Sequence, residues 1–449
     1  MISELKIFFQ LAVKKFLMNK TLLGLPVLSP HFFYLFSLSV LSVALGIQII
    51  LLPWLVVDQL SLSSIWVGWV QAAVLIPNLL LLLLGGVSAD RGNGTRLLVP
   101  LLLINMCVHG VLAYLLFSGW LSIVVLMAYA VILGICNAFI QPWREYLLKQ
   151  VDDSAENSGL QSLVAKSSLC VYLGQAVGVS LSSFMTDIGA HNLLLIQLVA
   201  VLLAVIGFRC LLQRLVSLQG QLEENADKAP NSQVQVNHAS STSTRAVLAE
   251  LRSGWSDLWA LPALRSLICL VAFNGFFHIG VFIVALPLLV QQVYGQPVMY
   301  FSGLQLAFLL GTITTTILVI VKGTLDAPGR RVIFGLLYGG IILFALSAKP
   351  TLTGLFVLLF FWGVVVGVSS TMGRAILQAL APEACRGRII SIYQLALFGC
   401  APLGALFAGY AIHWWGLIEL LKFSGIASLI MFAGMMATRA LWEVPEQAS

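Results

Sequence analysis

Charged side chains are scarce in this sequence. Only 9% of its 449 residues are Asp, Glu, Lys or Arg and 59% are hydrophobic, whereas soluble domains average about 25% charged residues. A chain this poor in charge cannot cover its own surface with polar side chains, so most of that surface must face hydrocarbon. The composition excludes a soluble enzyme.

Paired cysteines and basic stripes are missing as well. The seven cysteines show no C-x-x-C or other metal-like spacing, so we expect no disulfides, no metal and no cofactor. The formal net charge is +6, but Lys and Arg stand in ones and twos beside apolar runs, without interleaved aromatics. This pattern excludes nucleic acid as a partner and is better explained by orientation in a membrane.

Apolar runs of about 20 residues, each long enough to cross a bilayer as a helix, make up most of the chain. Backbone groups in lipid need internal partners, which favours helices over sheet. We therefore expect an all-α membrane protein with 12 transmembrane helices, near residues 31–57, 64–88, 97–118, 121–142, 158–185, 190–213, 263–292, 298–322, 331–348, 351–380, 387–412 and 416–440.

The distribution of Lys and Arg predicts the orientation of these helices. With the N-terminus inside, 21 of the 24 Lys and Arg residues fall in cytoplasmic segments, the three exceptions being Lys349 outside and Lys166 and Lys422 within spans. This asymmetry follows the positive-inside rule. We expect both termini on the cytoplasmic face.

Two polar intervals organise the chain. Residues 1–24 and the second part of 215–262 both place apolar side chains on one helical face, which is typical of helices that lie on a membrane surface. The order of charged and apolar residues in 1–24 does not match a cleaved signal peptide. The remainder of 215–262 is too polar to build a core. The expected organisation is an N-terminal amphipathic segment 1–29, a six-helix bundle 30–214, a linker with an interfacial helix 215–262, a second six-helix bundle 263–440 and a tail 441–449.

The turn after the second span of each half carries a similar motif, which resembles the signature G-x-x-x-D-[RK]-x-G-[RK]-[RK] of the major facilitator superfamily. The first copy lacks the inner Gly-basic-basic residues and retains only Arg96 at its far end, and the second keeps only Asp326, Gly329, Arg330 and Arg331 of the signature. The resemblance implies two pseudo-symmetric bundles, the major facilitator fold, with a conformational latch in these turns. The alternative is that the arginines only anchor the turns at lipid headgroups. The latch residues would be Gly86, Asp90, Arg91, Asp326, Arg330 and Arg331.

Small residues recur in the fifth span of each half. Gly174 and Gly178 share their spacing with Cys400 and Gly404. The pattern resembles the G-x-x-x-G-P-x-x-G-G motif of facilitator antiporters, with Val179 in place of proline, and this resemblance implies export. Close helix packing explains the same spacing without any reference to direction.

A third pattern narrows the resemblance. Pro142 and Arg144 after span four, and the run 386–393 into span eleven, resemble the bacterial enterobactin-exporter-like facilitators. That branch exports siderophores, macrolides and other amphipathic compounds across the bacterial inner membrane at the expense of the proton gradient. Fold analogy alone does not name a substrate.

No carboxylate is predicted at mid-membrane, because Asp58, Asp187 and Glu419 fall at the outer ends of spans. Basic groups are better represented, with Arg144 and Arg374 at the inner ends of spans four and ten. A cavity with cationic groups and no acid favours an anionic or neutral hydrogen-bonding substrate, since a bound cation would lack a counter-charge. Both arginines could instead serve as membrane anchors or in an inner gate.

Polar residues that share helix faces complete the candidate site. Such faces occur in spans one, five and seven, and facilitators bind midway between their halves. Histidine titrates near neutral pH and could carry a proton, although a hydrogen bond between helices is the commoner role. The candidate substrate-binding residues are Gln48, Gln161, Tyr172, Gln175, Asn274, His278, Arg144 and Arg374.

We therefore expect a monomeric secondary active transporter in the bacterial inner membrane that exports a small anionic metabolite, such as a siderophore, by alternating access and proton antiport. Its partners would be that substrate, protons and membrane lipids. A multidrug or macrolide exporter of the same fold is the alternative, and it would bind apolar cations with aromatics and a buried acid. A membrane-embedded enzyme would need a nucleophile–base or acid–base pair, which the sequence does not show.

Overall fold

The computed structural model of the chain describes residues 29–90, 95–153, 160–227, 262–322, 327–380 and 386–442. Every regular element in these ranges is a helix. The amphipathic segment expected at the start of the chain, the interfacial helix of the linker, Arg91 and Asp326 lie outside the described residues.

The helices before the linker form what we call the N-terminal bundle. They are α2 (Pro30–Trp54), continued by the π-helix η1 (Leu55–Gln59), and then α3 (Ser64–Asp90), α4 (Thr95–Phe117), α5 (Ile123–Asp153), α6 (Leu160–Ser182), the short α7 (Met185–Ile188) and α8 (Ala190–Asp227).

The helices after the linker form the C-terminal bundle. They begin with one long segment made of α10 (Pro262–Phe273), η2 (Asn274–Gly280), α11 (Val281–Leu288) and η3 (Leu289–Val293). They continue with α12 (Val298–Lys322), α13 (Pro328–Ser347), α14 (Leu352–Leu380), α15 (Arg386–Trp415) and α16 (Leu417–Thr438).

Eleven of the described helical segments are long and apolar enough to cross a membrane. The 23-residue α6 is not among them, and it carries the polar side chains of Lys166 and Gln175. Together with α6, these segments coincide with the twelve ranges predicted from the sequence. The expected all-α membrane fold is confirmed.

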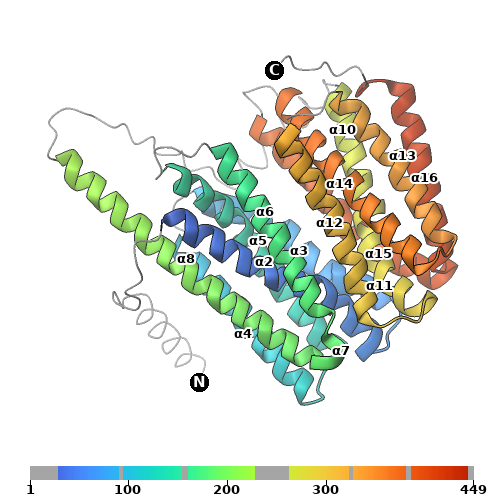
Figure 1. Cartoon of the computed structure of the whole chain (residues 1–449), viewed down its shortest axis with the longest axis horizontal. Helices are drawn as coiled ribbons and strands as arrows, with labels where there is room; N and C mark the ends of the chain where they lie inside the picture. Colours follow the sequence, from blue (N-terminus) through green and yellow to red (C-terminus); the bar gives the residue numbers. More distant parts are fainter. Residues whose placement is uncertain are drawn as a thin grey trace.

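The two bundles meet at one end and diverge toward the end at which α10 begins (Figure 1). At the diverging end each bundle has a separate apolar core, one around Trp143 and Phe208 and the other around Leu267 and Ile333. At the opposite end a single apolar cluster includes residues of both bundles. Polar contacts reinforce this closed end.

The closed end joins α2 and α3 to the second bundle. The Ser64 hydroxyl on α3 donates to the Gly409 carbonyl oxygen at 2.9 Å. The Gln291 side-chain amide in η3 donates to the Val57 carbonyl oxygen in η1 at 3.1 Å. The two π-helical segments at the ends of the first helix of each half are therefore tied to each other.

Glycines set the close approach of corresponding helix pairs in the two bundles. A Cβ atom at Gly178 would overlap the Val43 carbonyl oxygen on α2, and one at Gly404 would overlap the Phe276 carbonyl oxygen in η2. Only a residue without a side chain fits at such contacts. The repeated small-residue spacing is thus explained by packing, whatever the direction of transport.

Candidate functional site

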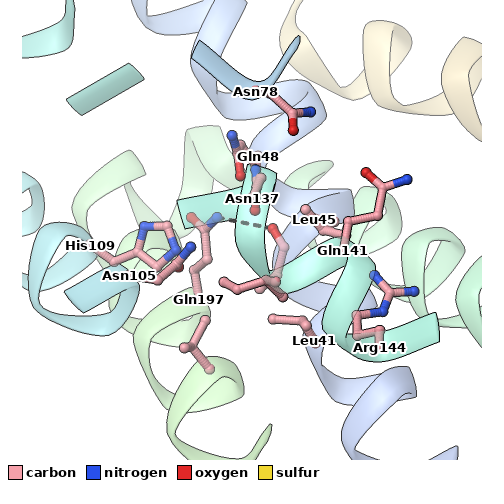
Figure 2. A pocket seen from close by; sticks show the side chains of 13 residues that line it. Leu41, Leu45, Gln48, Asn78, Asn105, His109, Asn137, Gln141, Arg144 and Gln197 are labelled. Atoms are coloured by element: carbon pink, nitrogen blue, oxygen red, sulfur yellow. Dashed lines mark hydrogen bonds between the residues drawn. The ribbon is translucent and has the colours of Figure 1, made fainter. Parts of the chain in front are cut away.

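A cavity of about 140 Å³ lies inside the N-terminal bundle, between α2, α3, α4, α5 and α8 (Figure 2). Its apolar wall comes largely from leucine, isoleucine and valine side chains. Its polar wall holds six carboxamides, one imidazole and one guanidinium, from Gln48, Asn78, Asn105, His109, Asn137, Gln141, Arg144 and Gln197.

Helical periodicity explains how so many polar groups reach one place. Asn105 and His109 lie one turn apart on α4, and Asn137, Gln141 and Arg144 follow one another on successive turns of α5. Residues three or four positions apart share a helix face. Two helices therefore present continuous polar stripes to the same cavity.

Three polar atoms in the cavity lining are buried without a hydrogen-bond partner among the described residues. They are Asn78 Oδ1, Arg144 Nε and Gln197 Oε1. Leaving such an atom unpaired costs about 1–3 kcal/mol, and more for a charged group. Because most buried polar groups are paired in native proteins, these atoms indicate a site that is completed by a polar occupant.

Neighbouring groups hold two of the lining side chains in place. The Gln197 side-chain amide donates to the Ala44 carbonyl oxygen on α2 at 3.0 Å, the bond drawn dashed in Figure 2. His109, only 1% exposed, has its Nδ1 atom 2.9 Å from the Tyr129 hydroxyl on α5. The cavity wall is therefore preorganised before a ligand arrives.

The lining contains one cationic residue, Arg144, and no carboxylate. Acids that the sequence placed at the outer ends of spans lie away from it. Asp58 and Asp187 are exposed, and Glu419 forms a 2.7 Å ion pair with Lys422 on the surface of α16. The lining therefore carries one cation and no acid, and the Glu145 carboxylate, the next residue on α5, interacts with the Arg144 charge from outside the lining.

The structure brings together two of the candidates chosen from the sequence, Gln48 and Arg144. Tyr172 and Gln175 lie on α6, which does not line the cavity. Gln161 falls in the first turn of α6, and its side chain lies outside the described residues. Span five thus contributes to the packing between α2 and α6 instead of to this cavity.

The candidates of the second half lie elsewhere. The His278 ring, in η2, is 2.9 Å from the Ser428 hydroxyl on α16 and packs edge-on against Trp362. Asn274 is half-buried at the start of η2, and Arg374 is exposed on α14. His278 therefore forms a hydrogen bond between helices, which is the commoner of the two roles considered for a buried histidine.

The residues of the two motif-bearing turns are described only in part. Gly86 and Asp90 lie in the last turn of α3, and the side chain of Asp90 lies outside the described residues. The Arg330 guanidinium lies 4.9 Å from the centre of the Trp442 ring, just beyond α16. This cation–π contact anchors the beginning of α13 within its own bundle.

Sequence analysis missed several of the lining residues as site candidates: Asn78, Asn105, His109, Asn137, Gln141 and Gln197. A signal for four of them exists in the sequence, because Asn105 with His109 and Asn137 with Gln141 repeat at four-residue spacing inside apolar spans. The spacing of residues in the sequence does not indicate that the polar faces of α4 and α5 pack against those of α2 and α8.

Two bundles of membrane-spanning helices that meet at one end and diverge at the other, with a polar cavity inside the first bundle, fit the class of alternating-access membrane transporters. A sequence profile of the Major Facilitator Superfamily matches residues 34–348. The chain belongs to this superfamily. It is a secondary transporter and not an enzyme.

Solved structures of transporters share the fold. A peptide transporter of the POT family in an auto-inhibited state superposes with a TM-score of 0.69 at 13% identity, covering 94% of this chain and 98% of its own. A D-xylose–proton symporter gives 0.65 at 16% identity, with 93% and 98% coverage. A bacterial homologue of the human lysosomal transporter Spinster, inward-facing and unoccupied, gives 0.62 at 15%, with 92% and 96%.

No individual curated protein matches the chain by sequence. Because the solved structures share so little sequence identity with the chain, their similarity establishes its fold but not its substrate. The substrate has to be inferred from the chemistry of the cavity.

Proposed function

We propose that this transporter exports a small anionic metabolite, such as a siderophore, by alternating access. The observation that carries the proposal is the cavity in the N-terminal bundle, where Arg144 stands among six carboxamides with no lining carboxylate. An anion would pair with the guanidinium. A cation would place a second positive charge in low-dielectric surroundings, which is strongly unfavourable.

The arrangement of the bundles supports a state that is open toward the cytoplasm. The helix ends at the diverging side carry basic residues such as Lys149, Arg265, Arg331 and Arg439, whereas Lys349 stands at the closed side. By the positive-inside rule, the diverging side faces the cytoplasm. In this state an exporter would load its substrate.

Proton antiport and location in the bacterial inner membrane are supported by the resemblance of the Pro142 and Arg386–Tyr393 regions to enterobactin-exporter-like facilitators. His109 is the histidine among the residues that line the cavity. It replaces His278 as the proposed proton carrier, since His278 lies in the other bundle, away from this cavity.

Export of macrolides or other drugs is a second candidate, favoured by an aromatic cluster in the C-terminal bundle. Phe282 lies 5.0 Å from Phe308 and 5.1 Å from Trp362 between ring centres. Hydrophobic and aromatic side chains commonly line sites that bind apolar compounds. The two candidates differ in their dependence on Arg144.

Uptake into everted membrane vesicles separates the candidates. We expect a radiolabelled catecholate siderophore to accumulate and a cationic dye not to accumulate. Arg144→Met should lower siderophore uptake about 10- to 100-fold, because a hydrogen bond to a charged group contributes about 1.5–3 kcal/mol. Arg374→Met, the matched change at the corresponding exposed arginine, should change uptake less than about twofold, as is usual for exposed charges. Accumulation of the dye alone, or equal effects of the two variants, would refute the proposal.

The orientation is tested by single-cysteine labelling. In a background without the native cysteines, Arg331→Cys and Lys349→Cys place thiols at the two ends of α13. A membrane-impermeant maleimide should label position 349 in intact cells and position 331 only in everted vesicles. The reverse pattern would place the diverging end outside.

A further inference from the structure

The three unpaired atoms of the cavity are not chemically alike. Gln197 Oε1 and Asn78 Oδ1 can only accept a hydrogen bond, whereas Arg144 Nε can only donate one. Gln197 is fully buried, and its nitrogen already donates to the Ala44 carbonyl oxygen. Exchanging its amide oxygen and nitrogen would place two acceptors against each other, so the identity of the free acceptor is fixed.

A ligand that satisfies this wall must combine two features. It needs an anionic acceptor for Arg144, and it needs O–H or N–H donors for Asn78 and Gln197. A plain anion leaves two buried carbonyl oxygens unpaired, and a neutral polyol offers Arg144 Nε only an uncharged acceptor, which makes a weaker hydrogen bond. Each omission costs about 1–3 kcal/mol.

The volume of the cavity limits the size of the group that enters it. About 140 Å³ is close to that of an engineered protein cavity of about 150 Å³ that accepts one benzene ring. The N-terminal bundle therefore has room for one substituted ring, or for a chain of similar size.

Taking the proposed function as its basis, we propose that the cavity recognises a ring-sized hydroxylated carboxylate, either as the whole substrate or as one group of a larger one. The carboxylate pairs with Arg144, and the hydroxyl groups donate to Asn78 and Gln197. This assignment goes beyond the charge of the substrate, because it requires hydrogen-bond donors on the same small group.

Four compounds of similar size test the two requirements separately. Binding of 3,4-dihydroxybenzoate, benzoate, catechol and tyramine to the purified full-length protein in lipid nanodiscs is measured by isothermal titration calorimetry. We expect dihydroxybenzoate to bind about 5- to 30-fold more tightly than benzoate or catechol, as the loss of one or two hydrogen bonds predicts. Tyramine, which has a donor but carries a cation, should bind most weakly.

Two variants show whether the preference arises at the assigned atoms. Asn78→Leu and Gln197→Met remove an acceptor with little change in size, and each should weaken dihydroxybenzoate binding about 5- to 10-fold while leaving benzoate binding unchanged. Gln197→Met also removes the bond to Ala44, so Asn78→Leu is the cleaner test. Asn192→Leu, at an exposed carboxamide near the start of α8, is the matched control.

The outcomes distinguish this inference from the proposed function. Equal binding of benzoate and dihydroxybenzoate overturns the inference, and so does binding of none of the four compounds. In either case a loss of siderophore export in Arg144→Met would still uphold the proposed function. Preferred binding of tyramine would overturn both.

Discussion

The N-terminal and C-terminal bundles both bury polar side chains but use them differently. In the first bundle, the side-chain oxygens of Gln197 and Asn78, two residues that line a cavity, are buried without a hydrogen-bond partner among the described residues. In the second, Thr312 and Thr315 on α12 donate to the carbonyl oxygens of Gly363 and Val364 on α14, at 3.2 and 3.1 Å. Polar groups there hold helix against helix.

This difference shows that a polar residue within a membrane span does not by itself mark a binding site. What matters is whether its hydrogen-bonding capacity is already used inside the protein. Ser302 and Ser424 in the second bundle also have hydroxyl groups without a partner in the described part of the chain. The unpaired atoms of Asn78, Arg144 and Gln197, by contrast, belong to residues that line one cavity. We therefore propose the first bundle as the recognition surface for the substrate.

The largest expected effect is a loss of stability at the close helix contacts that both bundles form through glycine. Gly178→Val and Gly404→Val each force a side chain into a neighbouring backbone carbonyl, and each should destabilise the folded protein by about 3 kcal/mol or more. Thermal unfolding in detergent measures this loss. Gly434→Val is the control, because a Cβ atom there meets nothing within 4 Å. A large loss in only one bundle would break the structural parallel between them.

Removing the hydrogen-bond partners of the two buried histidines, His109 and His278, should affect transport to different degrees. Tyr129→Phe leaves His109 without its partner, and Ser428→Ala does the same for His278. Each should lower the free energy of unfolding by about 1–2 kcal/mol. Only Tyr129→Phe should also reduce siderophore uptake in everted vesicles, by several-fold, because His109 lines the cavity. Reduced uptake in Ser428→Ala at normal protein levels would contradict the assigned difference.

A smaller effect is expected at the contact between the bundles. Gln291→Leu removes the hydrogen bond from η3 to the Val57 carbonyl oxygen, which contributes about 0.5–1.5 kcal/mol. The population of the state closed at this end should fall roughly 2- to 10-fold relative to the alternative state. Spin-label distances across this end measure the shift, with Gln296→Leu in the adjoining turn as a control. An unchanged distance distribution would show that apolar packing alone closes this end.

Much of the fold could be predicted because lipid leaves few alternatives. Runs of about 20 apolar residues must form helices, and most of the observed helices match the predicted ranges to within a few residues. The exceptions are α5 and α8, which continue to Asp153 and Asp227 although their spans were predicted to end at 142 and 213. The π-helical segments that interrupt the first helix of each half were not anticipated. Two of them are joined by the hydrogen bond between Gln291 and Val57, residues far apart in the sequence.

The cavity was only partly predictable. Arg144 could be predicted as a site residue from its charge, and Gln48 from its polar side chain in an apolar helix. The neutral amides of α4 and α8 could not be assigned to the site from the sequence, because whether their hydrogen bonds are satisfied depends on distant residues. Gln197, for example, bonds to Ala44 at a separation of 153 positions. Sequence spacing indicates which side chains share a face, but only the packed structure shows which of them remain unpaired.

The smallest effect is expected at Lys422, which the sequence placed among the basic groups within spans. Its ammonium group pairs with Glu419 at 2.7 Å near the start of α16, with the two side chains 41% and 57% exposed. Ion pairs three or four residues apart on a helix surface contribute about 0.2–0.5 kcal/mol. Lys422→Ala should therefore leave thermal stability and siderophore uptake nearly unchanged, in contrast to Arg144→Met. A loss of uptake comparable to that of Arg144→Met would mean that the C-terminal bundle also supplies a cation to the substrate, and recognition could then no longer be assigned to the N-terminal bundle alone.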